Sequence, residues 1–440
     1  MAAPAQSHVV IIADGASDQP LAELGGRTPL EAAQTPALDA LARRGAVGTA
    51  GTTPPGWQAG SDVCSMCLLG YDPREYHTGR APLEAAAIGL DPPAGAHLYR
   101  VNLVSVGEPG TPDEGLMLDH SAGAISDAEA RELFEALARA WGAAVPGVWG
   151  RSELRHGVSY RGVWANWSGL AHGEVVTTPP HEVPGKPWRH HAPTARNTGE
   201  AALEAERVLG AMIAASAAAL PGHPVNAARR AAGKRPANLA WPWGQGTRPS
   251  MPGFQGRFGV RGAMTTAVDL LAGIAHLIGW TRLRVPGVTS YHDNDYAAQG
   301  RATVEALADH GVVCCHVEAP DEASHQGDWR TKVAAIEAID RHVVGPIVRS
   351  LERDRPGRWR VMVLPDHATL VSTRRHHDAP VPVLIAGAGV APGRAARLTE
   401  AQAALGGWHV PQGHTLMDVL LRAPAVPPAA TPGPASAGEP

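Results

Sequence analysis

The sequence has few aromatic residues and no long apolar run. Phenylalanine, tyrosine and tryptophan make up 5% of the 440 residues, so aliphatic side chains and alanine must fill the core. No segment approaches the 18 or more uncharged apolar residues of a membrane span. The first seven residues have neither the basic start nor the apolar core of a signal peptide. We therefore expect a cytoplasmic protein with no membrane partner.

Cysteine and excess charge are scarce as well. Four cysteines are too few for a disulfide framework in a chain of this length, and we expect them to be buried, reduced thiols. The formal net charge is only −4, which gives no reason to expect nucleic acid as a partner. The oligomeric state stays open.

Short continuous apolar runs predict the strands of a mostly parallel sheet. These runs are residues 8–13, 312–317, 360–364 and 383–386. Helical patterns at 35–44, 303–310 and 332–344 lie between them. Strands that alternate with helices are typical of an α/β fold whose sheet is flanked by helices on both faces. Lys332, which begins the last helical pattern, is expected on a solvated face.

The middle of the chain has a different pattern. Residues 127–140 and 190–220 are helical, whereas residues 151–169 alternate like antiparallel strands. Loops rich in proline, glycine and tryptophan at 241–259 then lead back to the parallel pattern.

These patterns predict a discontinuous core domain. The core is expected to comprise residues 1–105 and 241–423, with a smaller α+β domain inserted at 106–240. Residues 424–440 are rich in proline and alanine and are expected to form a disordered tail.

Metal-ligating residues follow three of the expected strands. Asp14 follows the first, Asp321 and His325 follow the second, and Asp366 and His367 follow the third. Ligands bind beyond the carboxyl ends of the strands in open α/β sheets, so these side chains are expected to meet. Carboxylate and imidazole ligands without thiolate suit Mn²⁺, Zn²⁺ or Mg²⁺. Two such ions about 4 Å apart would form the clamp used for phosphoryl displacement.

Ser61 is the candidate nucleophile. It follows Gly60 and precedes a buried helical pattern, so its hydroxyl is expected at a helix N-terminus, where free N–H groups favour an anion. The same position also suits a helix N-cap. The nearby metal ligands favour the nucleophile, because metal coordination can activate a serine hydroxyl.

Several longer segments occur in order along residues 8–422. They include Ala13-Asp-Gly-Ala-Ser-Asp-Gln-Pro, Gly60-Ser-Asp, Thr78-Gly-Arg, Val317-Glu-Ala-Pro-Asp-Glu-Ala-Ser-His and Leu364-Pro-Asp-His. In these segments the chain resembles the archaeal type of 2,3-bisphosphoglycerate-independent phosphoglycerate mutases, of the alkaline phosphatase superfamily. The resemblance implies an alkaline-phosphatase-like fold and an isomerase of glycolysis and gluconeogenesis. Such an enzyme interconverts 3-phosphoglycerate and 2-phosphoglycerate through a phosphoserine, without an organic cofactor. Because water must be excluded from the phosphoserine, the inserted domain at 106–240 is expected to be a substrate-capping domain.

The resemblance also implies two divalent metal ions, with manganese expected and magnesium or zinc as alternatives. The ligands that it implies are Asp14, Ser61, Asp366 and His367 for one ion, and Asp321, His325 and His376 for the other. His377 and, more distantly, His414 remain alternatives to His376.

Arg80, Arg261 and His181 are weaker candidates for binding the small phosphorylated substrate. Arg80 lies in the Thr78-Gly-Arg segment, and an arginine suits bidentate recognition of phosphate or carboxylate. The chain also departs from the family, with Val63-Cys-Ser65 where many archaeal members have Thr-Ala-His, and with Gly162 where a histidine is expected.

These departures leave the metal ligands intact but put the substrate in doubt. A related phosphotransferase acting on another small alcohol, such as homoserine, remains an alternative. So do a phosphomonoesterase and a non-catalytic phosphometabolite-binding protein.

Overall fold

The computed structural model describes residues 6–93 and 95–423, so the expected tail at 424–440 lies outside the described residues. The chain divides into two compact units. Unit 1 comprises Met1–His77 and Met251–Pro440, and unit 2 comprises Thr78–Ser250.

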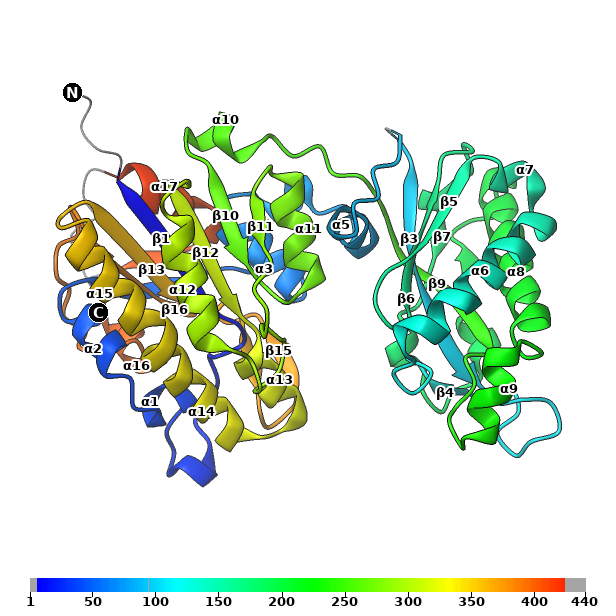
Figure 1. Ribbon diagram of the computed structural model, residues 1–440, viewed down its shortest axis with the longest axis horizontal. Helices are drawn as coiled ribbons and strands as arrows, with labels where there is room; N and C mark the ends of the chain where they lie inside the picture. Colours follow the sequence, from blue (N-terminus) through cyan, green and yellow to red (C-terminus); the bar gives the residue numbers. More distant parts are fainter. Residues whose placement is uncertain (1–5, 94, 424–440) are drawn as a thin grey trace, which may run out of the picture. The chain divides into compact units, whose positions relative to one another are not determined.

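Unit 1 is built on an eight-stranded sheet (Figure 1). In spatial order its strands are β11 (Thr281–Leu283), β10 (Gly262–Thr265), β12 (Val312–Val317), β1 (Ser7–Ala13), β13 (Trp359–Leu364), β16 (Val381–Gly387), β2 (Ala46–Ala50) and β17 (His409–Val410). Neighbouring strands are parallel except where β16 pairs with β13 and β2. The predicted fold class is confirmed, since this is a mostly parallel sheet flanked by helices.

One of the four expected strands differs in direction. Residues 383–386 lie in β16, which runs antiparallel to β13. A parallel neighbour needs a long crossover, usually a helix. The chain between β13 and β16 contains instead a short hairpin of β14 (Ala368–Leu370) and β15 (Arg375–His377).

Helices cover both faces of this sheet. On β1, Val9 and Ile11 belong to a core shared with α2 (Pro36–Ala42), α14 (Trp329–Ile339) and α15 (Gly345–Asp354). The alternate residues Val10 and Ile12 point to the other face and are fully buried too. The other helices of unit 1 are α1 (Pro29–Ala32), α3 (Ser61–Leu68), α4 (Pro73–Tyr76), α10 (Phe254–Phe258), α11 (Asp269–Leu277), α12 (Tyr296–Ala306), α13 (Ala319–Gln326), α16 (Glu400–Leu405) and α17 (Leu416–Arg422).

The register of the central strands brings their carboxyl ends together. Ala13 at the end of β1 pairs with Val317 at the end of β12, and Ile12 pairs with Leu364 at the end of β13. Residues that follow these three strands therefore emerge at one edge of the sheet.

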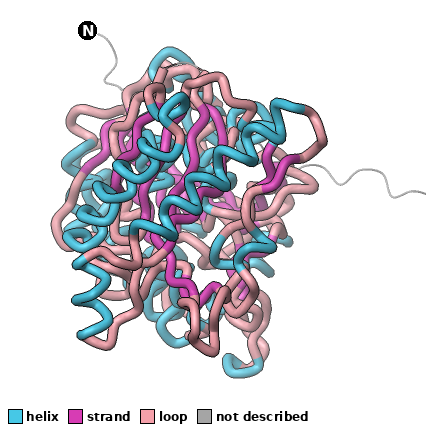
Figure 2. Tube along the Cα trace, turned by 90° about the vertical axis from the view of Figure 1, so that its right-hand side faces the viewer, coloured by secondary structure: helices cyan, strands magenta, loops and turns pink. Residues whose placement is uncertain are grey.

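Unit 2 has the predicted α+β composition. Its antiparallel sheet has the strand order β4 (Met117–Asp119), β3 (His97–Val106), β6 (Arg161–Asn166) and β5 (Ser152–His156), and β9 (Leu239–Thr247) also pairs with β3. The long helices α6 (Asp127–Ala144) and α8 (Glu200–Ala219) contact each other and this sheet. Figure 2 distinguishes the helices, strands and loops of the chain by colour. Shorter elements are α5 (Arg80–Ala87), α7 (Pro146–Trp149), α9 (Pro224–Ala231) and the pair β7 (Val175–Val176) and β8 (Thr194–Ala195).

Unit 2 is larger than the insertion expected at 106–240. Strand β3 is central to its sheet, and α5 packs on β3 and β9, so residues from 78 onward belong to it. The expected loop at 241–259 is wrong in its first part, because residues up to 247 form β9 through backbone pairing with β3. The expected helix at 190–220 begins only at Glu200.

Two expectations from composition can be compared with the structure. All four cysteines are buried and free. In the described part of the chain, no single helix has the length and apolar composition of a membrane span. The pair α8 and α9 meets that test only when taken together, and the two helices are bent by 58°.

Candidate metal centre

The residues expected to bind metal converge at the carboxyl edge of the unit 1 sheet. Asp14 follows β1, Asp366 and His367 follow β13, and Asp321 lies in α13 directly after β12. Asp14, Asp366 and His367 are fully buried, and Asp321 is 3% exposed. The strand order β12, β1, β13 explains this convergence, since parallel neighbours end at the same edge.

The first group of donors surrounds Nε2 of His367. This nitrogen lies 3.4 Å from Asp366 Oδ2, 3.6 Å from Asp14 Oδ1 and 3.4 Å from Ser61 Oγ. Ser61 is the first residue of α3, so the backbone N–H groups of the first helical turn adjoin its hydroxyl. Four donors of the types expected from the sequence therefore face one small volume.

In each of the two carboxylates of this group, only one oxygen has a hydrogen-bond partner among the described residues. Asp366 Oδ1 accepts hydrogen bonds from the backbone N–H groups of Gly15 and His367, and Asp14 Oδ2 lies 2.8 Å from His316 Nε2. Their other oxygens, which face His367, are buried and find no hydrogen-bond partner among the described residues. Burial together with the nearby Asp14 raises the pKa of Asp366 to about 7.

This arrangement fits a divalent cation. An unpaired charge in the interior costs several kcal/mol, by order of magnitude, unless a counter-charge is bound. Burial lowers the pKa of His367, so its imidazole is neutral and can donate a lone pair. Asp14, Asp366 and His367 have donor atoms within 4.8 Å of one another, as a single ion requires.

A second group consists of Asp321, His325 and His376. His325 Nε2 lies 3.1 Å from Asp321 Oδ2 and 2.9 Å from His376 Nε2, and His376 Nε2 lies 3.6 Å from Asp321 Oδ1. The i, i+4 spacing on α13 places Asp321 and His325 on one face of the helix. Contact with Asp321 raises the pKa of His325 to about 9. Two imidazole nitrogens that point at each other beside a carboxylate are again suited to a cation.

The hairpin register selects His376 over His377. Thr369 pairs with His376, and Ala368 pairs with His377. Side chains alternate between the faces of a strand, so the two histidines point in opposite directions. The structure places His376 among the donors, whereas His377 is 42% exposed and His414 lies in another segment, beside Asp72.

Two residues of this region, His316 and Glu318, have no counterpart among the ligands predicted from the sequence. His316 lies within β12, with Nε2 on Asp14 and Nδ1 3.1 Å from Thr266 Oγ1. Glu318 Oε2 is 3.6 Å from His316 Nε2, and burial, with the neighbouring Asp14, raises the pKa of Glu318. The only sequence signal for His316 is an imidazole inside a continuous apolar strand.

Lys332 is not on a solvated face, as the helical pattern suggested. It is fully buried, and its Nζ donates to Asp18 Oδ2 at 2.8 Å, to Thr369 O at 2.7 Å and to Ser17 O at 3.2 Å. The amphipathic pattern failed here because α14 packs its lysine against the β1–α1 connection and the β14 strand.

The three candidate substrate-binding residues have different locations. Arg261 is exposed and precedes β10, at the amino end of a strand parallel to β12, so the structure does not bring it to the carboxyl edge. Arg80 is the first residue of α5, and His181 lies in a short helical turn at Pro180–Glu182. Both of these residues belong to unit 2.

Unit 2 collects positively charged groups of its own. Arg100 on β3 binds both oxygens of Glu84, at 3.0 Å and 2.8 Å, and its guanidinium lies 4.2 Å from the centre of the Trp243 ring. Burial lowers the pKa of Arg100, and the charges of Arg80 and Arg161 lower it further. The charged members are Arg80, Arg100 and Arg161, beside the imidazoles of His120 and His181, whose pKa values are lowered by burial so that they are neutral. We call these five residues the cationic cluster.

The family departures have a packing explanation in part. A side chain at Gly162 would place its Cβ 2.4 Å from the ring of Phe134, so a histidine cannot replace this glycine without moving the ring. Ser65 is fully buried within α3.

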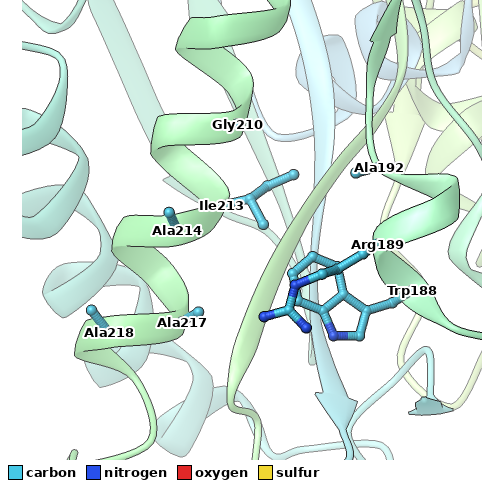
Figure 3. Close-up of a pocket in the computed structure, with 8 residues that line it drawn as sticks. All are labelled: Trp188, Arg189, Ala192, Gly210, Ile213, Ala214, Ala217 and Ala218. Atoms are coloured by element: carbon cyan, nitrogen blue, oxygen red, sulfur yellow. The ribbon is translucent and has the colours of Figure 1, made fainter. Parts of the chain in front are cut away.

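Unit 2 also contains a pocket of about 550 Å³ (Figure 3). It is lined by Trp188 and Arg189 on one side and by a face of α8 on the other, mainly Gly210, Ile213, Ala214, Ala217 and Ala218. This lining contains no carboxylate, imidazole, hydroxyl or thiol side chain, so the pocket does not compete with the candidate metal ligands as the candidate active site.

Comparisons with known proteins agree with this geometry. Residues 42–226 match the profile of a family described as 2,3-bisphosphoglycerate-independent phosphoglycerate mutase. A protein of that name from Methanothrix thermoacetophila is 42% identical over 94% of this chain and 99% of its own length. A probable mutase of the same type from Geobacter sulfurreducens is also 42% identical, over 94% of this chain and 99% of its own length.

Solved structures show the same fold. The PH0037 protein from Pyrococcus horikoshii is 27% identical and superimposes with a TM-score of 0.76 over 94% of this chain and 96% of that one. A cofactor-independent phosphoglycerate mutase from Thermoplasma acidophilum, 24% identical, superimposes with a TM-score of 0.65 over 96% of this chain and 100% of that one. The chain belongs to the family of 2,3-bisphosphoglycerate-independent phosphoglycerate mutases.

Proposed function

We propose that the protein interconverts 3-phosphoglycerate and 2-phosphoglycerate through a phosphoserine at Ser61. The observation that carries this proposal is the position of Ser61 Oγ, 3.4 Å from His367 Nε2 and beside two carboxylates that each have one oxygen without a hydrogen-bond partner among the described residues. A serine at a helix N-terminus next to two groups of metal donors is suited to accept a phosphoryl group.

We propose manganese as the resident metal. The ligands would be Asp14, Ser61, Asp366 and His367 for one ion, and Asp321, His325 and His376 for the other. When bound, these ions would lower the pKa of the Ser61 hydroxyl and offset charge on the phosphoryl oxygens. Carboxylate and imidazole donors without thiolate also accept magnesium or zinc, which metal analysis of the purified protein distinguishes.

Ser61 performs the chemistry in two transfers. In the first, Ser61 Oγ loses its proton and bonds to phosphorus while the ester bond to one glycerate oxygen breaks, and that oxygen takes up a proton. In the second, the other hydroxyl of glycerate loses its proton as it attacks phosphorus, the bond to Ser61 Oγ breaks, and Ser61 Oγ takes up a proton. The N–H groups at the start of α3 adjoin the phosphoserine and stabilise its charge. Water must be kept away between the steps, or the enzyme becomes a phosphatase.

We propose that the cationic cluster of unit 2 binds the anionic groups of the substrate. Arg100 is held in place by Glu84 and Trp243, and Arg80 lies in the first turn of α5, where the helix dipole disfavours a cation. A bound carboxylate or phosphate would relieve the repulsion among these groups. From this function we also predict that the protein acts in glycolysis and gluconeogenesis and that it is located in the cytoplasm.

Phosphorus NMR of the protein loaded with Mn²⁺ and 3-phosphoglycerate tests the function. We expect 2-phosphoglycerate without free phosphate, no turnover after Ser61→Ala, and full turnover after Ser65→Ala. Ser65 is the matched control, because it is a buried serine on the same helix whose hydroxyl has no hydrogen-bond partner within the described residues.

Other outcomes identify the alternatives. Free phosphate would indicate a phosphomonoesterase. An unchanged spectrum with both metals bound would rule out phosphoglycerate and direct the search to other acceptors, with homoserine first. If the wild-type protein shows no turnover, and Ser61→Ala leaves its ligand binding unchanged, the protein is a non-catalytic binding protein.

A further inference from the structure

Thr369 lies between the two groups of metal donors. It is the central residue of β14, it is fully buried, and its Oγ1 contacts one candidate ligand from each group. Oγ1 lies 2.5 Å from Asp321 Oδ1 and 3.1 Å from His367 Nδ1. Asp321 belongs to the second group and His367 to the first.

The hydrogens of this contact can be arranged in one way when the ligands are in their binding forms. A threonine hydroxyl has one proton to donate, and an ionised carboxylate can only accept. The hydroxyl therefore donates to Asp321 Oδ1, and its oxygen accepts from His367 Nδ1–H. His367 is then the Nδ1–H tautomer, and its Nε2 lone pair faces Ser61, Asp14 and Asp366.

The backbone around Thr369 fixes the hydroxyl in this position. Thr369 N donates to Ser17 O at 3.1 Å, and Thr369 O accepts from Lys332 Nζ at 2.7 Å. Gly15 leaves the necessary space, because a Cβ there would lie 2.7 Å from Thr369 Oγ1 and 2.5 Å from Asp321 Oδ1. The buried Lys332 thus binds the backbone of β14, the strand that carries Thr369.

We propose that Thr369 is a positioning residue shared by both metal sites, whose single hydroxyl sets the His367 tautomer and orients Asp321. Partners that orient a metal ligand are generally worth 10- to 100-fold in metal affinity. Both sites should therefore weaken when this one hydroxyl is removed. The inference rests on the two-metal centre of the proposed function but not on its substrate.

Calorimetric titration of the metal-free protein with Mn²⁺ tests this, since it requires no turnover. We expect Thr369→Val, which keeps the shape of the side chain, to weaken both binding steps by about 10- to 100-fold. Thr369→Ser restores the hydroxyl and should bind both ions within about threefold of wild type. Thr303→Val is the matched control, because Thr303 is a fully buried threonine of unit 1 that donates to Gln299 O instead.

A spectroscopic measurement separates positioning from a loss of stability. Long-range nitrogen–proton NMR of the imidazole rings in the metal-free protein should show Nδ1–H for His367 in wild type and Thr369→Ser. Wild-type affinity at either site in Thr369→Val, or no recovery in Thr369→Ser, would overturn the proposal. If Thr369→Val does not fold, an Nε2–H tautomer of His367 in the wild-type protein would overturn it.

Discussion

Unit 1 buries carboxylates whose hydrogen bonding is incomplete within the described residues, whereas unit 2 buries an arginine whose partners the chain itself supplies. In unit 1, Asp14 and Asp366 each leave one oxygen without a hydrogen bond among the residues described. In unit 2, Arg100 donates to both carboxylate oxygens of Glu84, and its guanidinium lies over the Trp243 ring. We propose that a cation completes the first group and that the arginines of the second bind an anion.

The difference indicates how a phosphotransferase can obtain positive charge from two sources, metal ions and arginine side chains. Metal ions can supply positive charge close to the reacting phosphorus, but they must be bound by groups that repel each other in their absence. Arginines can bind the remaining charge of a substrate without any cofactor. Each site can therefore be disabled separately, and each should fail in its own way.

The largest effect is expected from Asp366→Asn. The amide removes a buried negative charge that the cation requires, so turnover should fall by roughly 1,000-fold or more, equivalent to about 4 kcal/mol. The metal-free variant should nevertheless be more stable than metal-free wild type at pH 8, by about 2 to 4 kcal/mol. The sign follows from the raised pKa of Asp366, since a carboxyl with a raised pKa costs stability above that pKa.

Thermal unfolding measures the stability of the variant relative to wild type. The variant should be more stable than wild type in EDTA, and Mn²⁺ should stabilise it less than wild type. Asp354→Asn, at an exposed aspartate of α15, is the control and should leave the effect of Mn²⁺ unchanged. Stabilisation of Asp366→Asn by Mn²⁺ equal to that of wild type would show that the free carboxylate oxygens do not hold a cation.

A smaller effect is expected in unit 2 from Arg80→Gln and Arg161→Gln. Each removes one positive charge of the cationic cluster, and a hydrogen bond to a charged group contributes about 1.5 to 3 kcal/mol. KM for 3-phosphoglycerate should rise by roughly 10- to 100-fold while Mn²⁺ affinity stays at the wild-type value. Arg139→Gln, an exposed arginine on α6, is the control for charge alone. Loss of Mn²⁺ affinity in either variant would break the division of roles between the units.

The smallest effect is a loss of folding stability at acidic pH. Burial lowers the pKa of His172, which contacts Tyr99 and Asn166 in unit 2, to about 3. The unfolded chain gains a proton near pH 6.5 while the folded chain does not, so stability is lost as the pH falls below 6.5. Between pH 7.5 and 5.5 this group should cost about 1.4 kcal/mol.

Hydrogen exchange resolved by peptide measures this loss within unit 2. His172→Gln removes the titrating group, and β3 and β6 should then lose less protection between the two pH values than in wild type. An unchanged pH dependence in the variant would show that another group is responsible.

Most of the convergence of candidate metal ligands could be predicted from the sequence. Asp14, Asp321 and Asp366 directly follow apolar runs, and parallel strands that end at one edge bring such residues together. The choice between His376 and His377 could not be made, because it depends on the register of a three-residue hairpin. His316 and Thr369 were missed, since a polar residue inside a buried strand has the same local pattern whether or not it contacts a ligand.

The first residue of unit 2 could not be predicted from the sequence either. Residues 78–105 resemble the flanking chain in pattern, yet β3 pairs with β6 and β9 and joins the second unit. That this unit acts as a substrate-capping domain stays a prediction.

The sequence by itself determined the α/β class, the nucleophile candidate and the types of metal ligand, because these depend on local periodicity and on residues that adjoin it. Only the tertiary structure decided which histidine faces the centre, why Lys332 is buried and how one hydroxyl joins the two groups. These depend on strand pairing and packing between segments more than 300 residues apart, such as Lys332 and Asp18, which local patterns do not encode.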